Sequence, residues 1–557
     1  MKQRVVNSRL RLLLLVIVLT FAALGARAAW LQTVRASSLA RLAQKQAKFD
    51  LVLPAGRGTL FDRLGTPLAI GEQATDVIAD PMQISDPRHE ARIAAKVLGI
   101  RFRPLYLKLA DNSRGFVYVQ RKAPPRRAAA LAKRQLVGFT FESDERRVYP
   151  QGTVAAPVLG YAGLDNTGLA GLELQLNKEL SGTPGRATVV RDALGQAVNT
   201  IQERPARDGR DVFLTLDNHI QANAEQVLEQ TVRQWHAKDA SAIVLDPHTG
   251  AILAMAQEPG YNANYYPVAT THGLTVDHAV NDVFEPGSVF KVVTVGGALS
   301  EHKVTPSTAF TLPYSIHVAD RVIHDAELRP TERMTVAQIL QRSSNVGAIT
   351  IAERYLGEAG LKRWMARFGF GRRTGIDLPG ESPGLLPSYW SGSTIGNVPI
   401  GQGVSVTSIQ LASVYAAIAN GGEWIEPHLV DHVLGDPQAR PQRRRVLAPG
   451  VDRELRAMLK GVVSDQGTAA RAAIPGYTVA GKTGTAQKPG PHGYIPGAYV
   501  ATFVGMVPAS SPRLVVLVTV DEPHLAIFGG IVAAPAFAQI ASFDLQYLEV
   551  PPDLAVR

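Results

Sequence analysis

The 557-residue sequence contains no cysteine. The chain therefore forms no disulfide bond and no cysteine metal site, which is compatible with an oxidising compartment such as the periplasm. Its thirteen histidines do not fall into H-E-x-x-H or a comparable metal-ligand spacing. From the sequence we expect neither a metal nor a cofactor.

Acidic residues are almost missing from the first fifty positions, which contain nine Lys or Arg and a single acid, Asp50. This segment supplies +8 of the net charge of +10. No nucleic-acid-binding motif accompanies the excess of positive charge. We therefore interpret it as a membrane-topology signal and expect no nucleic-acid partner.

A run without charges over residues 12–26 follows four basic residues, Lys2, Arg4, Arg9 and Arg11. As a helix the run spans about 22 Å, less than the roughly 30 Å hydrocarbon core of a bilayer. If Arg27 snorkels to the interface, the segment reaches Val34 and becomes long enough. The sequence thus predicts an uncleaved single-pass anchor with its amino terminus in the cytoplasm. A cleaved signal peptide is the alternative, because Ala26-Arg27-Ala28 fits an A-x-A site, and both readings place the rest of the chain outside the cytoplasm.

A chain of this length is expected to form two or three domains. We predict a tail, transmembrane helix and linker helix over residues 1–50, a β-rich non-catalytic domain over 51–208, and a catalytic domain over 209–557. In the last of these, strand patterns lie near both ends and helical patterns fill the middle. This order predicts an α/β (α+β) fold whose sheet is built from both ends of the domain.

One stretch, Phe284 to Lys291, predicts a turn at Pro286-Gly287 that leads into a helix. Positions three apart are neighbours on a helix, so we expect Lys291 Nζ within hydrogen-bond reach of Ser288 Oγ. A hydroxyl becomes a nucleophile when a base takes its proton, and lysine serves as that base when burial or nearby cations lower its pKa. Ser288 is the candidate nucleophile and Lys291 its candidate base.

Two further motifs follow in the chain, Ser343-Ser344-Asn345 and Lys482-Thr483-Gly484-Thr485. An S-x-x-K match alone is weak, because it arises by chance in long sequences. S-x-x-K, S-D-N and K-T-G together are the signature of class A β-lactamases and penicillin-binding proteins. All three occur here in that order, with Ser344 in the place of the aspartate, so the combined signal is strong.

With these motifs the chain resembles the class B penicillin-binding proteins over nearly its whole length, most closely the cell-division transpeptidases of the FtsI type. Further matching segments are residues 374–381, 400–403, 529–530 and 533–535. The resemblance implies a serine transpeptidase and β-lactamase-like domain with a five-stranded antiparallel sheet. It also implies a β-rich pedestal domain and one transmembrane helix before that domain.

The K-T-G segment is expected to bind the substrate. Lys482 adds positive charge, which favours both the neutral form of Lys291 and the terminal carboxylate of a peptide. Thr483 and Thr485 offer hydroxyl donors to that carboxylate. Gly484 lets an extended peptide approach the strand edge.

The remaining site residues act on the reacting groups. Asn345 offers an amide that donates to and accepts from a peptide group. The resemblance places Ser343 between Lys291 and the leaving amine as a proton relay. It also implies an oxyanion hole made of the backbone N–H groups of Ser288 and Thr485.

The resemblance implies a substrate and partners as well. The D-Ala-D-Ala end of a peptidoglycan stem peptide would acylate Ser288, and an amine of a neighbouring stem peptide would resolve the acyl-enzyme. β-Lactams would acylate the same serine as substrate mimics. Septal wall synthesis at the bacterial inner membrane, with the catalytic domain in the periplasm and partners such as FtsW, is the implied setting.

Other functions stay open at this level. An elongation-type transpeptidase shares all three motifs, and a β-lactamase, a β-lactam sensor or a silent division scaffold is less favoured. The sequence departs from the family at Val289, at Ile527-Phe528 and at residues 277–280. These departures are compatible with a specialised second copy of the division enzyme.

Overall fold

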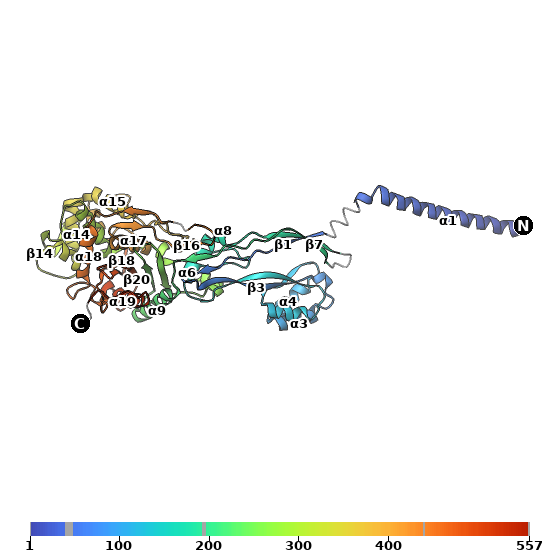
Figure 1. The fold of residues 1–557 in the computed structure, drawn as a ribbon, viewed down its shortest axis with the longest axis horizontal. Coiled ribbons are helices and arrows are strands. Elements are labelled where there is room, and N and C mark those ends of the chain that lie inside the picture. Colours follow the sequence, from blue (N-terminus) through green and yellow to red (C-terminus); the bar gives the residue numbers. More distant parts are fainter. Residues whose placement is uncertain (1, 39–47, 192–196, 438–439, 555–557) are drawn as a thin grey trace. The chain divides into compact units, whose positions relative to one another are not determined.

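The computed structural model describes residues 2–38, 48–191, 197–437 and 440–554 (Figure 1). The chain divides into two compact units. The first covers Met1–Gly56 and Gly182–Asp208, and the second covers Arg57–Ser181 and Gly209–Arg557. One unit boundary coincides with the predicted boundary after residue 208, but residues 57–181 of the predicted middle domain belong to the second unit. The domain division given above stays a prediction.

The first unit contains helix α1 (Lys2–Thr33) and a three-stranded sheet in the order β1 (Lys48–Leu53), β6 (Gly185–Arg191) and β7 (Ala197–Arg204). Within α1, the 24-residue stretch Leu10–Thr33 has a mean hydropathy of 2.3, and its apolar window contains no buried residue. Such a helix is about 36 Å long, enough to cross a bilayer. Arg27 and Arg35 lie over the ring of Trp30, an amphipathic residue typical of membrane interfaces. The helix is consistent with a single-pass membrane anchor.

The second unit is built on a five-stranded antiparallel sheet, which confirms the predicted fold class. Its strand order is β10 (Ile252–Glu258), β9 (Asp239–Leu245), β20 (Leu514–Asp521), β19 (Gly493–Val507) and β18 (Ala480–Gly490). Nearly every residue of β9, β10 and β20 is buried. Because successive side chains of a strand point to opposite faces, the sheet is covered on both sides.

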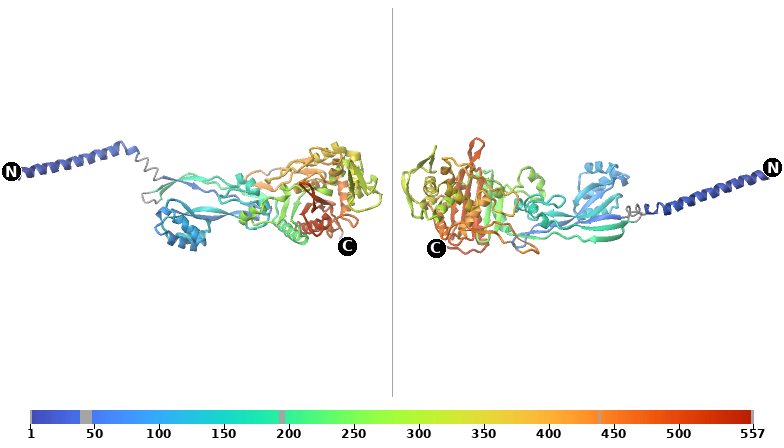
Figure 2. Two further views of the ribbon diagram at one scale, coloured as in Figure 1. Left: turned by 180° about the vertical axis from the view of Figure 1, so that it is seen from behind. Right: turned by 90° about the horizontal axis from the view of Figure 1, so that it is seen from above.

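Helices supply that cover (Figures 1 and 2). α9 (Asn218–Trp235) and α19 (Gly529–Tyr547) pack against each other and the sheet, while α17 (Ser408–Ala419) packs on β9, β19 and β20. The other elements between β10 and β18 include α12 (Lys291–Ser300), α13 (Val336–Gln341), α14 (Asn345–Ile351), α15 (Gly357–Phe368) and α18 (Val451–Val462). The sheet is therefore assembled from both ends of this part of the chain, as predicted.

A second sheet of the same unit has the order β16 (Val430–Val433), β8 (Val212–Leu214), β2 (Leu60–Phe61), β3 (Pro67–Ala79) and β4 (Val117–Ala123), with β5 (Phe139–Val148) also on β3. β2 pairs in parallel with β8. Three helices, α3 (Pro87–Leu98), α4 (Phe102–Leu109) and α5 (Pro125–Ala132), form a small separate core with this sheet. The segment over residues 57–148 is called the pedestal below.

Buried ion pairs hold the pedestal to the short helix α7 (Gly171–Gln175). Arg57 Nε donates to Glu173 Oε2 at 2.7 Å, and Arg147 Nε donates to Glu173 Oε1 at 2.6 Å. All three side chains are buried, so each charge depends on its partners for stabilisation. Asp62 lies outside this group and accepts from the backbone N–H groups of Leu64 and Thr66 in a tight turn.

The Glu225 side chain connects α9 to the backbone at Ala155. Its carboxylate is expected to make the stability of the protein depend on pH. Glu225 Oε1 accepts from the Ala155 N–H at 2.8 Å, and burial raises the pKa of Glu225 to about 7. In the unfolded chain this pKa is ordinary, so the native state binds the proton more tightly. The stability that Glu225 contributes is complete below about pH 4.5 and is lost as the pH rises to about 7.

We expect Glu225→Gln to raise the free energy of unfolding by about 1 to 3 kcal/mol at pH 8 and to change it little at pH 5. Denaturant unfolding of the detergent-solubilised chain at the two pH values measures this difference. Glu229→Gln, on the same helix but exposed and paired with Arg233, is the matched control. An equal effect of Glu225→Gln at both pH values would contradict the expectation.

Candidate active site

Ser288 lies in a 3-10 turn, Gly287–Phe290, that runs directly into α12. Gly287 has φ of 56°, a conformation that favours glycine, and its N–H donates to the Gly401 carbonyl at 3.1 Å. A side chain at residue 287 would meet the Thr485 carbonyl oxygen at 3.0 Å. The predicted turn is therefore present, and it sets Ser288 beside the K-T-G strand β18.

Lys291 is fully buried at the start of α12. Its Nζ donates to the Ser343 carbonyl at 2.5 Å, to Asn345 Oδ1 at 2.8 Å and to Ser343 Oγ at 3.2 Å. Burial lowers the pKa of Lys291 to about 7, although Asp325 opposes the shift. At neutral pH a large fraction of this lysine is therefore the free amine that a general base requires.

The expected hydrogen bond between Ser288 and Lys291 does not appear in the described part of the chain. The two shortest contacts of Lys291 Nζ go to Ser343 and Asn345 instead. A neutral amine has two N–H donors, which these two acceptors use, and one lone pair. The lone pair stays available for the proton of the serine hydroxyl.

Ser343 has φ of 58°, the left-handed region that a non-glycine residue rarely adopts. This backbone places its carbonyl oxygen on Lys291 and its Oγ between two lysines. Lys482 Nζ donates to Ser343 Oγ at 2.9 Å, and Lys482 is fully buried on β18. Burial and then the charge of Lys291 lower the pKa of Lys482 well below its ordinary value. The structure thus brings the three predicted motifs to one point.

The K-T-G strand β18 is an edge strand of the five-stranded sheet. Thr485 Oγ1 accepts from the Gly529 N–H at 3.1 Å, so its own hydroxyl hydrogen remains free to donate. Thr483 Oγ1 instead shares a hydrogen bond with Thr468 Oγ1 at 2.8 Å. Gly484 also has a structural role, because a side chain there would meet the Pro286 carbonyl oxygen at 2.7 Å.

Both polar atoms of the Asn345 side-chain amide form hydrogen bonds within the protein. Its Oδ1 accepts from Lys291, and its Nδ2 donates to the His324 carbonyl at 3.0 Å. One amide hydrogen and one lone pair remain for a substrate peptide group. Asn345 therefore orients Lys291 in addition to the role that the motif predicted.

Sequence reasoning missed the residue that holds the second motif in place. The buried Asp325 carboxylate accepts from Ser344 Oγ at 2.9 Å and from the Val346 N–H at 3.0 Å, and pairs with Arg329. Ser344 also caps α14 through the Gly347 N–H. Asp325, which lies on another loop, thus places a carboxylate beside Ser344, the position that is aspartate in S-D-N. No sequence spacing indicates this contact.

Two of the noted departures lie at the border of the site. Phe528 is exposed and immediately precedes Gly529, whose N–H binds Thr485 Oγ1. Val289 is buried in the turn that carries Ser288. The third, residues 277–280, begins with the buried Asp277, which caps the short helix α11 (His278–Asn281). Phe528 is therefore the departure that is exposed near the strand edge.

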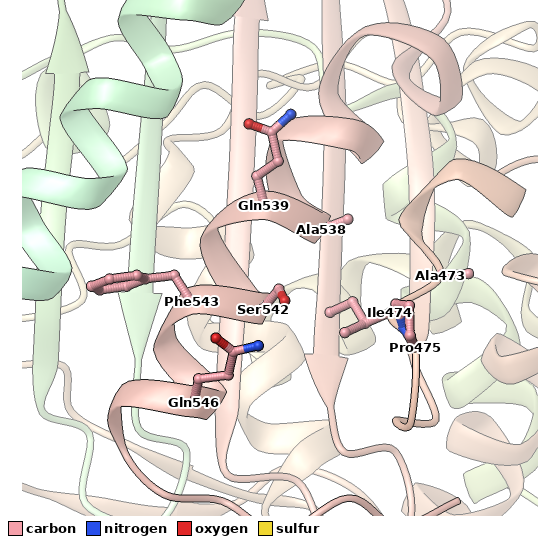
Figure 3. A pocket seen from close by; sticks show the side chains of 8 residues that line it. All are labelled: Ala473, Ile474, Pro475, Ala538, Gln539, Ser542, Phe543 and Gln546. Carbon is pink, nitrogen blue, oxygen red and sulfur yellow. The ribbon is translucent and has the colours of Figure 1, made fainter. Parts of the chain in front are cut away.

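A hollow of about 430 Å³ on the outer side of α19 is separate from this site. Ile474 and Pro475 lie opposite Ser542, whereas the ring of Phe543 points away from them (Figure 3). None of the predicted site residues lines it.

Comparison with known proteins agrees with this geometry. Residues 240–542 match the penicillin binding protein transpeptidase domain, and residues 52–214 match the penicillin-binding protein dimerisation domain. The chain belongs to the penicillin-binding proteins.

Relatives of this penicillin-binding protein span nearly its full length. It is 34% identical to the penicillin-binding protein PbpB of Mycolicibacterium smegmatis, over 94% of this chain and 87% of that protein. It is 32% identical to the peptidoglycan D,D-transpeptidase FtsI of Escherichia coli K12, over 98% and 93%. A crystal structure of penicillin binding protein 3 from Mycobacterium tuberculosis complexed with ampicillin superposes with a TM-score of 0.72 at 31% identity, covering 91% of this chain and 98% of that one.

Proposed function

We propose that this penicillin-binding protein is a peptidoglycan D,D-transpeptidase that cross-links stem peptides of the septal wall through an acyl-enzyme on Ser288. The observation that carries the proposal is the convergence of two buried lysines on Ser343 Oγ, next to the turn of Ser288. An isolated buried lysine is costly, so a pair of them indicates a site built for proton transfer.

In the acylation step, Ser288 Oγ attacks the carbonyl carbon between the two D-alanines, and its proton passes to the free amine of Lys291. The N–H groups of Ser288 and Thr485 stabilise the oxyanion. The C–N bond then breaks, and the leaving amine of D-alanine takes a proton that Ser343 relays from Lys291. In the second step the amine of a neighbouring stem peptide attacks the ester, and Ser288 regains its proton.

Substrate binding uses the edge of β18. The main chain of an extended stem peptide adds to this edge, and the Thr485 hydroxyl together with Lys482 binds its terminal carboxylate. A β-lactam acylates Ser288 in the same manner, with its amide bond in the position of the peptide bond.

The proposal includes a location and partners. α1 spans the inner membrane once with the amino terminus in the cytoplasm, because basic residues precede the apolar stretch. Residues 51–208 form a non-catalytic domain and residues 209–557 form the catalytic domain, and both lie in the periplasm. Division proteins such as FtsW are the proposed partners, and elongation-type synthesis is the alternative role.

The test is intact-mass analysis of the solubilised chain with penicillin, followed over hours. We expect one adduct per chain that persists in the wild type and is absent in Ser288→Ala. Ser307→Ala, an exposed serine outside the site, is the matched control and should keep the adduct. Labelling of Ser288→Ala would overturn the assignment of the nucleophile, and rapid loss of the wild-type adduct would indicate a β-lactamase.

A further inference from the structure

The end of the pedestal sheet carries apolar side chains that the described residues leave uncovered. Ala79, the last residue of β3, pairs with Val117 at the start of β4 and with Phe139 at the start of β5. The last residue of β3 and the first residues of β4 and β5 therefore lie together at one end of the sheet. The residues just beyond these ends belong to one small surface.

Three large apolar side chains lie on this surface, which we call the apolar tip: Met82, Phe116 and Val137. They are 66%, 52% and 62% exposed. Gly115 lies next to Met82, because a side chain at residue 115 would meet the Met82 sulfur at 3.6 Å. Asp80 N–H donates to the Gly138 carbonyl at 2.8 Å, which brings Val137 to the same place.

The tip lies far from the catalytic site. Ala69, near the other end of β3, belongs to the large core that includes the five-stranded sheet, and about 30 Å of strand separates it from Ala79. Figure 2 shows the pedestal helices, coloured blue, at the end of β3 away from the green-to-red catalytic part. The exposed apolar residues are therefore not part of the substrate site.

The segment that carries the apolar tip has an excess of positive charge. Residues 80–138 contain thirteen Lys or Arg and four Asp or Glu, so this segment and the first fifty residues together hold more positive charge than the whole chain's net +10. Arg114, next to the tip, is 67% exposed and pairs with Asp111, and Arg121 lies over the ring of Tyr118 and pairs with Asp76 and Asp165. The exposed apolar groups lie in the same segment as this charge.

We propose that the apolar tip is a second membrane contact, which inserts into the interface of a bilayer rich in anionic phospholipid. Apolar side chains flanked by Lys and Arg are the combination that binds such an interface. The positive charge and the exposed apolar groups together favour the lipid.

The covalent chain limits how far the second unit lies from the proposed membrane anchor α1. Helix α1 ends at Thr33 and the second unit begins at Arg57, so the connecting residues span at most about 80 Å when extended. A tether of this length raises the effective concentration of bilayer at the tip, and a weak contact is then sufficient. The contact would restrain the pedestal relative to the membrane plane.

The absence of cysteine makes a direct test simple, because a single introduced cysteine takes a label without background. The full chain with Met82→Cys carries an environment-sensitive fluorophore and is reconstituted in vesicles that contain nitroxide lipids. One set is phosphatidylcholine alone, and the other contains about one third phosphatidylglycerol. Leu328→Cys, at an 84% exposed position of the catalytic part, is the control.

We expect nitroxide lipids to quench the label at residue 82 at least about twofold more than the label at residue 328 in anionic vesicles. The difference should fall in phosphatidylcholine vesicles and at about 0.5 M salt, where charges are screened. Phe116→Ser or Arg114→Gln, added to Met82→Cys, should also reduce it. Equal quenching at both positions, or no dependence on anionic lipid, overturns the proposal. A label at residue 82 that is shielded only in native membranes would instead assign the tip to a protein partner.

Discussion

Replacing Lys291 by arginine is expected to slow acylation by penicillin about 10³-fold, within the range that general-base catalysis contributes. The guanidinium keeps its proton at any pH at which the protein is folded, so it cannot take the proton of Ser288. Stopped-flow measurement of acylation by a chromogenic cephalosporin gives the rate. The fold should be retained, as judged by circular dichroism and thermal unfolding.

The wild-type rate should depend on pH in the corresponding way. Lys291 is a base only when it is neutral, and burial lowers its pKa to about 7. Acylation should therefore rise from about pH 6 and level off above about pH 8. Lys362→Arg, at a surface pair with Glu358, serves as the control and should leave the rate unchanged. A flat profile over this range, or a Lys291→Arg rate within tenfold of the wild type, would contradict the assignment of the base.

Glu173→Ala is expected to lower the free energy of unfolding by about 3 to 5 kcal/mol. Glu173 is fully buried and pairs with both Arg57 and Arg147, so its removal leaves two buried guanidinium groups without their carboxylate. Denaturant unfolding of the solubilised chain measures the loss. Acylation of the folded fraction should persist, because the ion pairs lie outside the site.

The surface pair of the same pedestal provides the matched control for this experiment. Glu72 pairs with Arg146 at 2.8 Å, and both side chains are about half exposed. Exposed pairs contribute roughly 0 to 1 kcal/mol, so Glu72→Ala should change stability little. Similar losses for the two variants would show that burial does not decide the contribution of these charges.

Local patterns predicted the catalytic turn and the strands because both depend on neighbouring residues. A proline followed by a glycine, as at Pro286-Gly287, favours a turn through local conformation alone. The apolar stretches at both ends of the catalytic part likewise indicate buried strands. The order of the motifs predicted the family. Fold class and family were therefore accessible from the sequence.

The residues that contact these motifs could not be predicted from the sequence, because they lie on loops that are distant in the chain. Asp325 holds Ser344 across nineteen positions, and Thr468 binds Thr483 across fifteen. Neither follows a helical or strand period. The missing Ser288–Lys291 hydrogen bond has the same origin, since Ser343 and Asn345 take the contacts of the lysine. Spacing predicts which residues can meet, whereas tertiary packing decides which acceptor is used.

The free edge of β18 has a consequence for the association of copies of the enzyme. An unpaired strand that accepts a substrate peptide can also pair with the same strand of another copy, which leads to aggregation. Two residues near the end of β18 limit such pairing. Pro489 has no N–H to donate, and Lys488 carries a charge that pairs with Asp521 and Glu522. Only a short part of the edge is therefore open, and it is too short for a continuous sheet between copies of the enzyme.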